Sequence, residues 1–169
     1  MDSMSADLIR GLETSLPKFF SFYFDREHFG ALLVSSDIDG AENYLSEFTN
    51  KNSNYQSNLM FYLVHRQRYL KYLIEGNFPF AGLCAALGPD ALVLFGTAET
   101  KKDFIDNDLQ RLRSVHLKLV DARAKGYTVD VAPFANDTTN EMFQMLNHLV
   151  ATNPDLLHKK DMSLLNAAT

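Results

Sequence analysis

Two aspartates separated by one residue are the side chains whose types and spacing best suit chemistry in this chain. Asp37 and Asp39 follow the apolar run Ala31–Val34 and precede Gly40. At the end of a strand, such a pair can offer a carboxylate and a backbone carbonyl to a hard cation such as Mg²⁺. The same residues are typical of an ordinary turn from a strand into a helix. We favour the turn and keep a site at Asp37 and Asp39 as the alternative.

Other motifs that carry chemistry are missing from the sequence. It has no Gly-x-Ser-x-Gly elbow and neither of the glycine-rich loops that cradle nucleotides. Its histidines show neither the i, i+4 spacing of a metal site nor a cysteine at ligand spacing. The one cysteine, Cys84, lies in the apolar segment 81–87 and is typical of a small buried side chain. We therefore expect no catalytic residue, metal or cofactor, and favour a protein that is not an enzyme.

Apolar periodicity predicts a helix-rich protein of the α+β or α/β class. Three short runs predict strands, over residues 30–35, 91–96 and 127–132. The spacing of apolar residues predicts helices over most of the remaining chain, including 5–16, 17–29, 39–49, 55–75, 97–125 and 138–150. The strand–helix–strand–helix order of the second half is typical of a βαβ crossover. We expect one domain, residues 1–169, with a small sheet of about three strands covered by roughly six to eight helices.

The segment around the two aspartates resembles the first motif of the haloacid-dehalogenase phosphatases, in which apolar residues precede Asp-x-Asp-Gly. Residues 92–97 are similar to the second motif, a strand that ends in Ser or Thr, and residues 41–88 stand where that family inserts a cap. The resemblance implies a Mg²⁺-dependent phosphohydrolase with Asp37 as nucleophile, Asp39 as general acid and Thr97 as a third site residue. The lysine and the acidic pair that complete the family's site have no well-placed counterpart in this sequence.

Aromatic side chains gather in the segment 18–29. Most aromatic side chains belong to a core, but they also anchor interfaces between proteins. Met142 and Met145 on the predicted helix 138–150 would add an adaptable apolar surface. We expect a protein-interaction module, such as an adaptor, chaperone, inhibitor or complex subunit, that binds a protein partner or a second copy of itself. Its preferred interface residues are Phe19, Phe20, Phe22, Tyr23 and Phe24.

The predicted helix 55–75 offers a second surface, in which basic and aromatic residues alternate. Arg66, Tyr69 and Tyr72 would share it and contact a protein partner or, as a third possibility, a nucleic acid. The formal net charge of -5 disfavours nucleic acid. The first residues lack the features of a signal peptide, and no apolar run approaches the ~20 residues that span a bilayer. We therefore expect a soluble cytoplasmic protein that does not contact a membrane.

Overall fold

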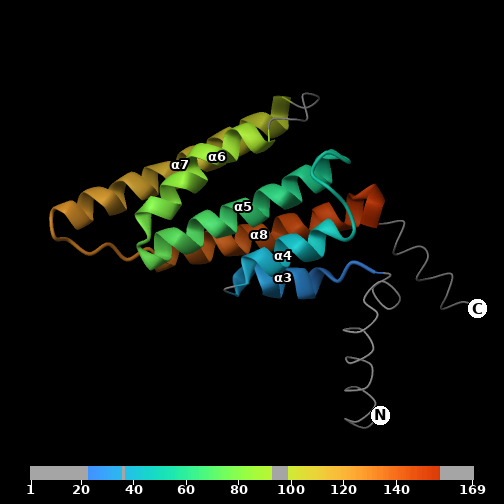
Figure 1. The fold of residues 1–169 in the computed structure, drawn as a ribbon, viewed down its shortest axis with the longest axis horizontal. Coiled ribbons are helices and arrows are strands. Elements are labelled where there is room, and N and C mark those ends of the chain that lie inside the picture. Colours follow the sequence, from blue (N-terminus) through green and yellow to red (C-terminus); the bar gives the residue numbers. More distant parts are fainter. Residues whose placement is uncertain (1–22, 36, 93–98, 157–169) are drawn as a thin grey trace, which may run out of the picture.

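The computed structural model describes residues 23–35, 37–92 and 99–156 of the chain. Within these ranges the chain forms helices, arranged as in Figure 1: α3 (Arg26–Val34), α4 (Ile38–Ser46), α5 (Tyr55–Glu75), α6 (Phe78–Leu92), α7 (Glu99–Ala124) and α8 (Ala132–Thr152). No strand is present in the described ranges, so the predicted mixed α and β fold with a small sheet is wrong. The predicted helix 5–16 and residues 17–22 of the predicted helix 17–29 lie outside the described residues.

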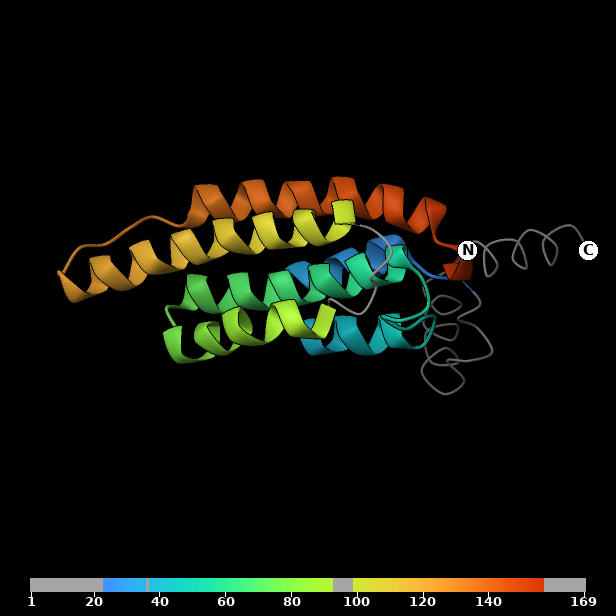
Figure 2. The same cartoon turned by 90° about the horizontal axis from the view of Figure 1, so that it is seen from above.

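Helix α5 is the centre of the fold, because each of the other helices packs against it. It lies between α7 and α8 in Figure 1 and between α7 and α6 in Figure 2. Its bounds, Tyr55–Glu75, confirm the prediction over 55–75. Asn54 caps its start by accepting the Ser57 N–H at 2.8 Å, and Gly76 ends it in the left-handed conformation at φ 70°. Residues on every side of α5 are buried, so this helix has no broad exposed face.

Helix α3 occupies the segment that the sequence predicted as the first strand, 30–35. Its start is capped by Asp25, whose carboxylate accepts a backbone N–H of the first turn at 3.0 Å. Phe29, Gly30 and Leu33 are buried while Ala31 is exposed, which is the pattern of a helix face, since one face of a strand would bury Ala31 together with Phe29 and Leu33. The prediction was wrong because a short apolar run fits a buried strand as well as it fits a buried turn of helix.

The other two predicted strands are corrected as well. Residues 127–131 form an extended connection from α7 to α8, and no described segment pairs with them as a strand. The alternating Tyr and Val residues there have the propensity of a strand, but a strand also needs a neighbour with which to exchange hydrogen bonds. Of the predicted strand 91–96, Ala91 and Leu92 complete α6, and the rest lies outside the described residues.

Helices α7 and α8 follow one another in the chain, yet they do not pack directly on each other. No Cα atoms of the two helices approach within 8 Å. Both lie along α5, and an ion pair from Arg111 on α7 to Glu141 on α8 spans the space between them. Helix α7 agrees with the predicted helix 97–125, whereas α8 begins before the predicted start at 138, since Pro133 is accommodated in its first turn. Helix α5 is thus the floor, and α7 and α8 the walls, of an open channel.

Candidate functional site

The two aspartates that suggested a metal site have structural roles. Asp37 is the N-cap of α4, and its Oδ1 accepts the Gly40 N–H at 3.0 Å. Asp39 lies in the first turn with a largely exposed side chain, and it pairs with Arg68 of α5 at 2.9 Å. The segment before them is α3 and not a strand, so the scaffold that a phosphatase motif requires is not there. Thr97, the third residue of that hypothesis, lies outside the described residues.

No metal site replaces that hypothesis within the described ranges. No three His, Cys, Asp or Glu side chains come together there in a way that could hold an ion. His65 instead contacts the Cys84 carbonyl at 2.9 Å, and burial lowers its pKa. Cys84 is itself buried, which raises the pKa of its thiol and leaves it a poor nucleophile.

The aromatic interface predicted over Phe19–Phe24 falls mostly outside the described ranges. Phe19, Phe20 and Phe22 lie there, so only the last two residues of the stretch can be placed. Tyr23 is exposed, whereas Phe24 is half-buried in an aromatic cluster with its ring centroid 5.2–5.4 Å from those of its neighbours, Phe29, Tyr44 and Phe48. Phe24 therefore belongs to the edge of the core, where it joins α3 to α4.

The second predicted surface, on helix 55–75, is not a surface. Arg66 and Tyr69 are fully buried, and Tyr72 is half-buried with its ring stacked on Phe80 at 5.4 Å. The Tyr69 hydroxyl contacts Nδ1 of His116 at 2.8 Å, and burial raises the pKa of Tyr69 to about 12. The three residues therefore cannot line up against a partner or a nucleic acid without opening the fold. The prediction that these residues form a surface was wrong because α5 is enclosed by helices from distant parts of the chain.

A buried ionic network joins α5, α7 and α8. Arg66 Nε lies 3.2 Å from Asp108 Oδ2, and Arg66 Nη2 lies 3.0 Å from Glu141 Oε2. Arg111 contacts both acids, at 3.0 Å and 2.7 Å respectively, and the Tyr62 hydroxyl donates to Asp108. Two cations and two carboxylates make the cluster electrically balanced, although Arg66 Nη1 has no hydrogen-bond partner among the described residues. The network holds the two walls of the channel to its floor.

The protonation of this network follows from its contacts. The hydrogen bond from Arg111 is the main reason why the pKa of Glu141 lies below its usual range, and that bond also raises the pKa of Arg111. Burial, and then the adjacent Asp108 carboxylate, raise the pKa of Tyr62. Glu141 is therefore ionised and Tyr62 is neutral at neutral pH. Such a cluster clamps helices together and has no group poised for proton transfer.

The channel between α7 and α8 contains an apolar groove, hereafter the α7–α8 groove. Its volume is about 600 Å³. Phe104 of α7 and Met145 of α8 line it from the two walls, and Leu59 of α5 lines it from the floor. Its remaining lining residues are Tyr55, Glu141, Gln144, His148 and Leu149. The sequence identified Met145 as an adaptable side chain but not Phe104, which reads as an ordinary position of a long polar helix.

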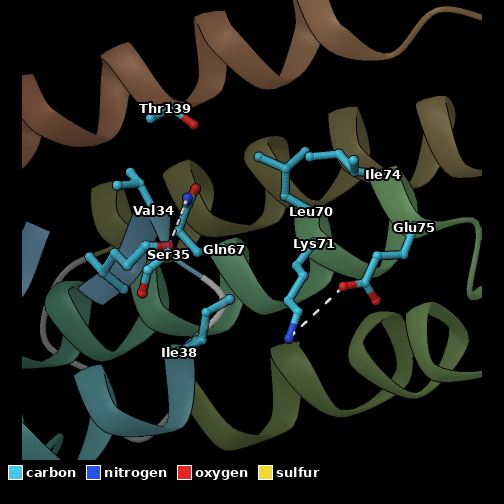
Figure 3. Close-up of a pocket in the computed structure, with 10 residues that line it drawn as sticks. Val34, Ser35, Ile38, Gln67, Leu70, Lys71, Ile74, Glu75 and Thr139 are labelled. Carbon is cyan, nitrogen blue, oxygen red and sulfur yellow. Dashed lines mark hydrogen bonds and ion pairs between the residues drawn. The ribbon is translucent and has the colours of Figure 1, made fainter. Parts of the chain in front are cut away.

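A second groove, hereafter the α3–α5 groove, lies between α3, the start of α4, α5 and α8 (Figure 3). Its volume is about 260 Å³. Five aliphatic residues line it: Leu33, Val34, Ile38, Leu70 and Ile74. Gln67 is its one buried polar side chain, and Figure 3 shows its amide hydrogen-bonded to the end of α3. Nothing in the sequence marked Gln67, because its hydrogen-bond partner, Leu33, lies 34 residues away in the chain.

Comparison with known proteins adds no functional assignment. The chain matches no protein-family model, and neither a curated protein nor a solved structure is detectably similar to it. Within the described ranges, no helix combines the length and the apolar character that crossing a membrane requires.

Proposed function

We propose that this protein is an interaction module that binds an amphipathic helix of a partner protein in the α7–α8 groove. The observation that supports this most directly is the separation of α7 and α8. Two helices that are neighbours in the chain leave between them an apolar groove of about 600 Å³. Antiparallel neighbouring helices in a bundle normally close on each other at 8–10 Å to bury their apolar faces. A helix from a partner would complete that packing.

The side chains of the groove suit a helical ligand. Phe104 is more than one-third exposed and Met145 is half-buried, so each has apolar surface still to lose to a partner. Aromatic and methionine side chains are common anchors in grooves of this kind, because Met adapts its shape and aromatic rings bury a large area. A ligand helix would insert its apolar residues at i, i+3 or i+4, and i+7 along the channel.

The charge around the groove selects the polar face of the ligand helix. Glu141 lies at the groove with its side chain 43% exposed, although it is already paired with arginines. On α7, Asp103 and Asp106 are exposed close to Phe104 in the chain, and the whole chain carries a net charge of -5. A ligand helix with lysine or arginine beside its apolar face would therefore be favoured over an acidic one.

The test compares two substitutions with a matched control. Phe104→Ser and Met145→Glu should each reduce partner binding at least tenfold, since they remove or block an anchor. Val120→Ser changes an apolar residue of α7 with about the same exposed fraction (40% against 37%) that does not line the groove, and it should bind as the wild type does. Tagged wild type and variants are used to capture proteins from cells, and each captured protein is quantified by mass spectrometry. Circular dichroism and urea unfolding check that every variant is folded.

The identity of the bound segment decides the proposal. A photo-crosslinking residue in place of Phe104 should attach to a peptide of the captured partner with helical apolar spacing and basic flanks. The proposal is overturned if the folded Phe104→Ser and Met145→Glu variants capture every protein as well as the wild type does. It is also overturned when the crosslinked peptide has no helical apolar face.

A further inference from the structure

The α3–α5 groove is separate from the site proposed above. It shares no lining residue with the α7–α8 groove. Val34 at the end of α3 and Ile74 near the end of α5 are each about half exposed at its edges. Leu33, Ile38 and Leu70 are buried beneath them. The groove is thus a small aliphatic hollow of about 260 Å³ on the surface of the described fold.

Gln67 is the feature that distinguishes this hollow from an ordinary gap between helices. Its side chain is 95% enclosed, at 5% exposure, and lines the groove. The amide Nε2 donates to the Leu33 carbonyl at 3.5 Å, a long and weak hydrogen bond. Its Oε1 has no hydrogen-bond partner in the part of the chain that the structure describes. A buried acceptor without a donor is destabilising, and native proteins rarely retain one without a reason.

Within the described fold the Gln67 side chain lines the hollow, and its Oε1 is left without a donor. A molecule that brings an N–H or O–H to that oxygen would remove the penalty of the unpaired acceptor, and its apolar body would cover the five aliphatic residues. The charged residues at the rim, Lys71 and Glu75, lie 4.0 Å apart and balance each other. The groove therefore favours a neutral ligand over an anion or a cation.

We infer that the α3–α5 groove is a binding site for a small, neutral, largely apolar molecule that carries one hydrogen-bond donor. The ligand is of about the size of an indole or a phenol, to judge from the volume of the hollow. Gln67 Oε1 is the acceptor that orients it. A molecule of the same shape without the donor leaves the acceptor unpaired and binds more weakly.

The test uses indole and benzofuran, which share a ring shape but differ in the N–H. Each is titrated into the ¹⁵N-labelled full chain, and amide shifts are followed by two-dimensional NMR. Indole should move amides around Val34, Gln67 and Ile74, with an affinity about tenfold above that of benzofuran, the usual effect of one buried hydrogen bond. Gln67→Met keeps the length of the side chain and removes the acceptor, so it should lower indole to the affinity of benzofuran. Ile74→Arg should block both ligands by filling the rim.

Any of four results would overturn this assignment. Indole and benzofuran could bind equally well to the wild type, or the preference for indole could survive Gln67→Met. The amides that shift could also lie away from the groove, or fail to shift at millimolar ligand. Gln67→Met removes a group whose acceptor is unsatisfied, so the variant is expected to fold, and its urea midpoint confirms this before titration.

Discussion

Removal of one charge from the network at the α5–α7–α8 junction should be the most destabilising single change in this fold. Arg66 is fully buried and the side chain of Asp108 is 5% exposed, so neither charge can recover its hydration when the other is removed. The proposed perturbations are Arg66→Met and Asp108→Leu, singly and together. Met has about the volume of Arg, which keeps cavity effects small, whereas Leu is larger than Asp, so overpacking adds about 1–3 kcal/mol to the cost of the second change.

The contacts of Arg66 and Asp108 predict different losses of stability for the two single variants. After Asp108→Leu, Arg66 keeps only Glu141, because its Nε and Nη1 already lack hydrogen bonds. The expected loss is about 4 kcal/mol, within the range for a buried charge left unpaired. After Arg66→Met, Asp108 keeps Arg111 at 3.0 Å and the Tyr62 hydroxyl. The loss should therefore be smaller, about 2 kcal/mol. Either is a large share of the roughly 5–15 kcal/mol that stabilises a domain.

Urea unfolding measures these losses directly. With a slope of about 2 kcal/mol per molar urea, Asp108→Leu should lower the unfolding midpoint by about 2 M. The double variant should lose less than the sum of the single losses by about 1–3 kcal/mol, because the second change removes a charge that the first has orphaned. Lys125→Ala breaks an ion pair that is more than half exposed and should change the midpoint little. A loss below about 1 kcal/mol for Asp108→Leu, or strict additivity, would refute the burial of this pair.

Two further predictions concern the Asp37 cap of α4 and the partly buried side chain of His65. Asp37→Ala should lower the free energy of unfolding by about 1 kcal/mol, while Asp37→Asn, which keeps the cap, should lose far less; equal losses would contradict the capping role. Burial lowers the pKa of His65 below its usual value of about 6.5, so the unfolded chain takes up a proton first as the pH falls, and stability declines below about pH 6.5. His65→Gln should weaken that decline between about pH 7 and pH 5, measured as urea midpoints, and an unchanged decline would show that His65 is not its source.

The helices could be predicted from the sequence where local signals agreed. Helix α5 was predicted from its apolar side and from Gly76, which ends it, and the structure adds a side-chain cap at Asn54. Helix α7 was predicted from its long apolar repeat within two residues at each end. These elements were correct because capping and periodicity act within a few residues and do not depend on neighbours from elsewhere.

The strands were predicted wrongly because a strand is not a local structure. The run 30–35 is short and apolar, and the run 127–132 has aromatic and β-branched residues. Each would have needed a second extended segment beside it. In the first case Asp25 caps a helix that takes in the apolar run, and the repeat of Phe29 and Leu33 places both on its buried face. In the second case the segment stays extended without a pairing strand among the described residues.

The candidate sites were missed for a related reason. A helix on a surface has one apolar face, so Arg66, Tyr69 and Tyr72 were assigned to an outer face that α5 does not have. The partners that enclose Arg66 are Asp108 and Glu141, which lie 42 and 75 residues further along the chain, too far for any local pattern to reveal the pairing. The same holds for Gln67, because only its contact with α3 shows that its side-chain oxygen is buried without a donor among the described residues. On an enclosed helix, polar residues therefore either join the helices through buried ion pairs or line a groove, and function should be sought at these positions.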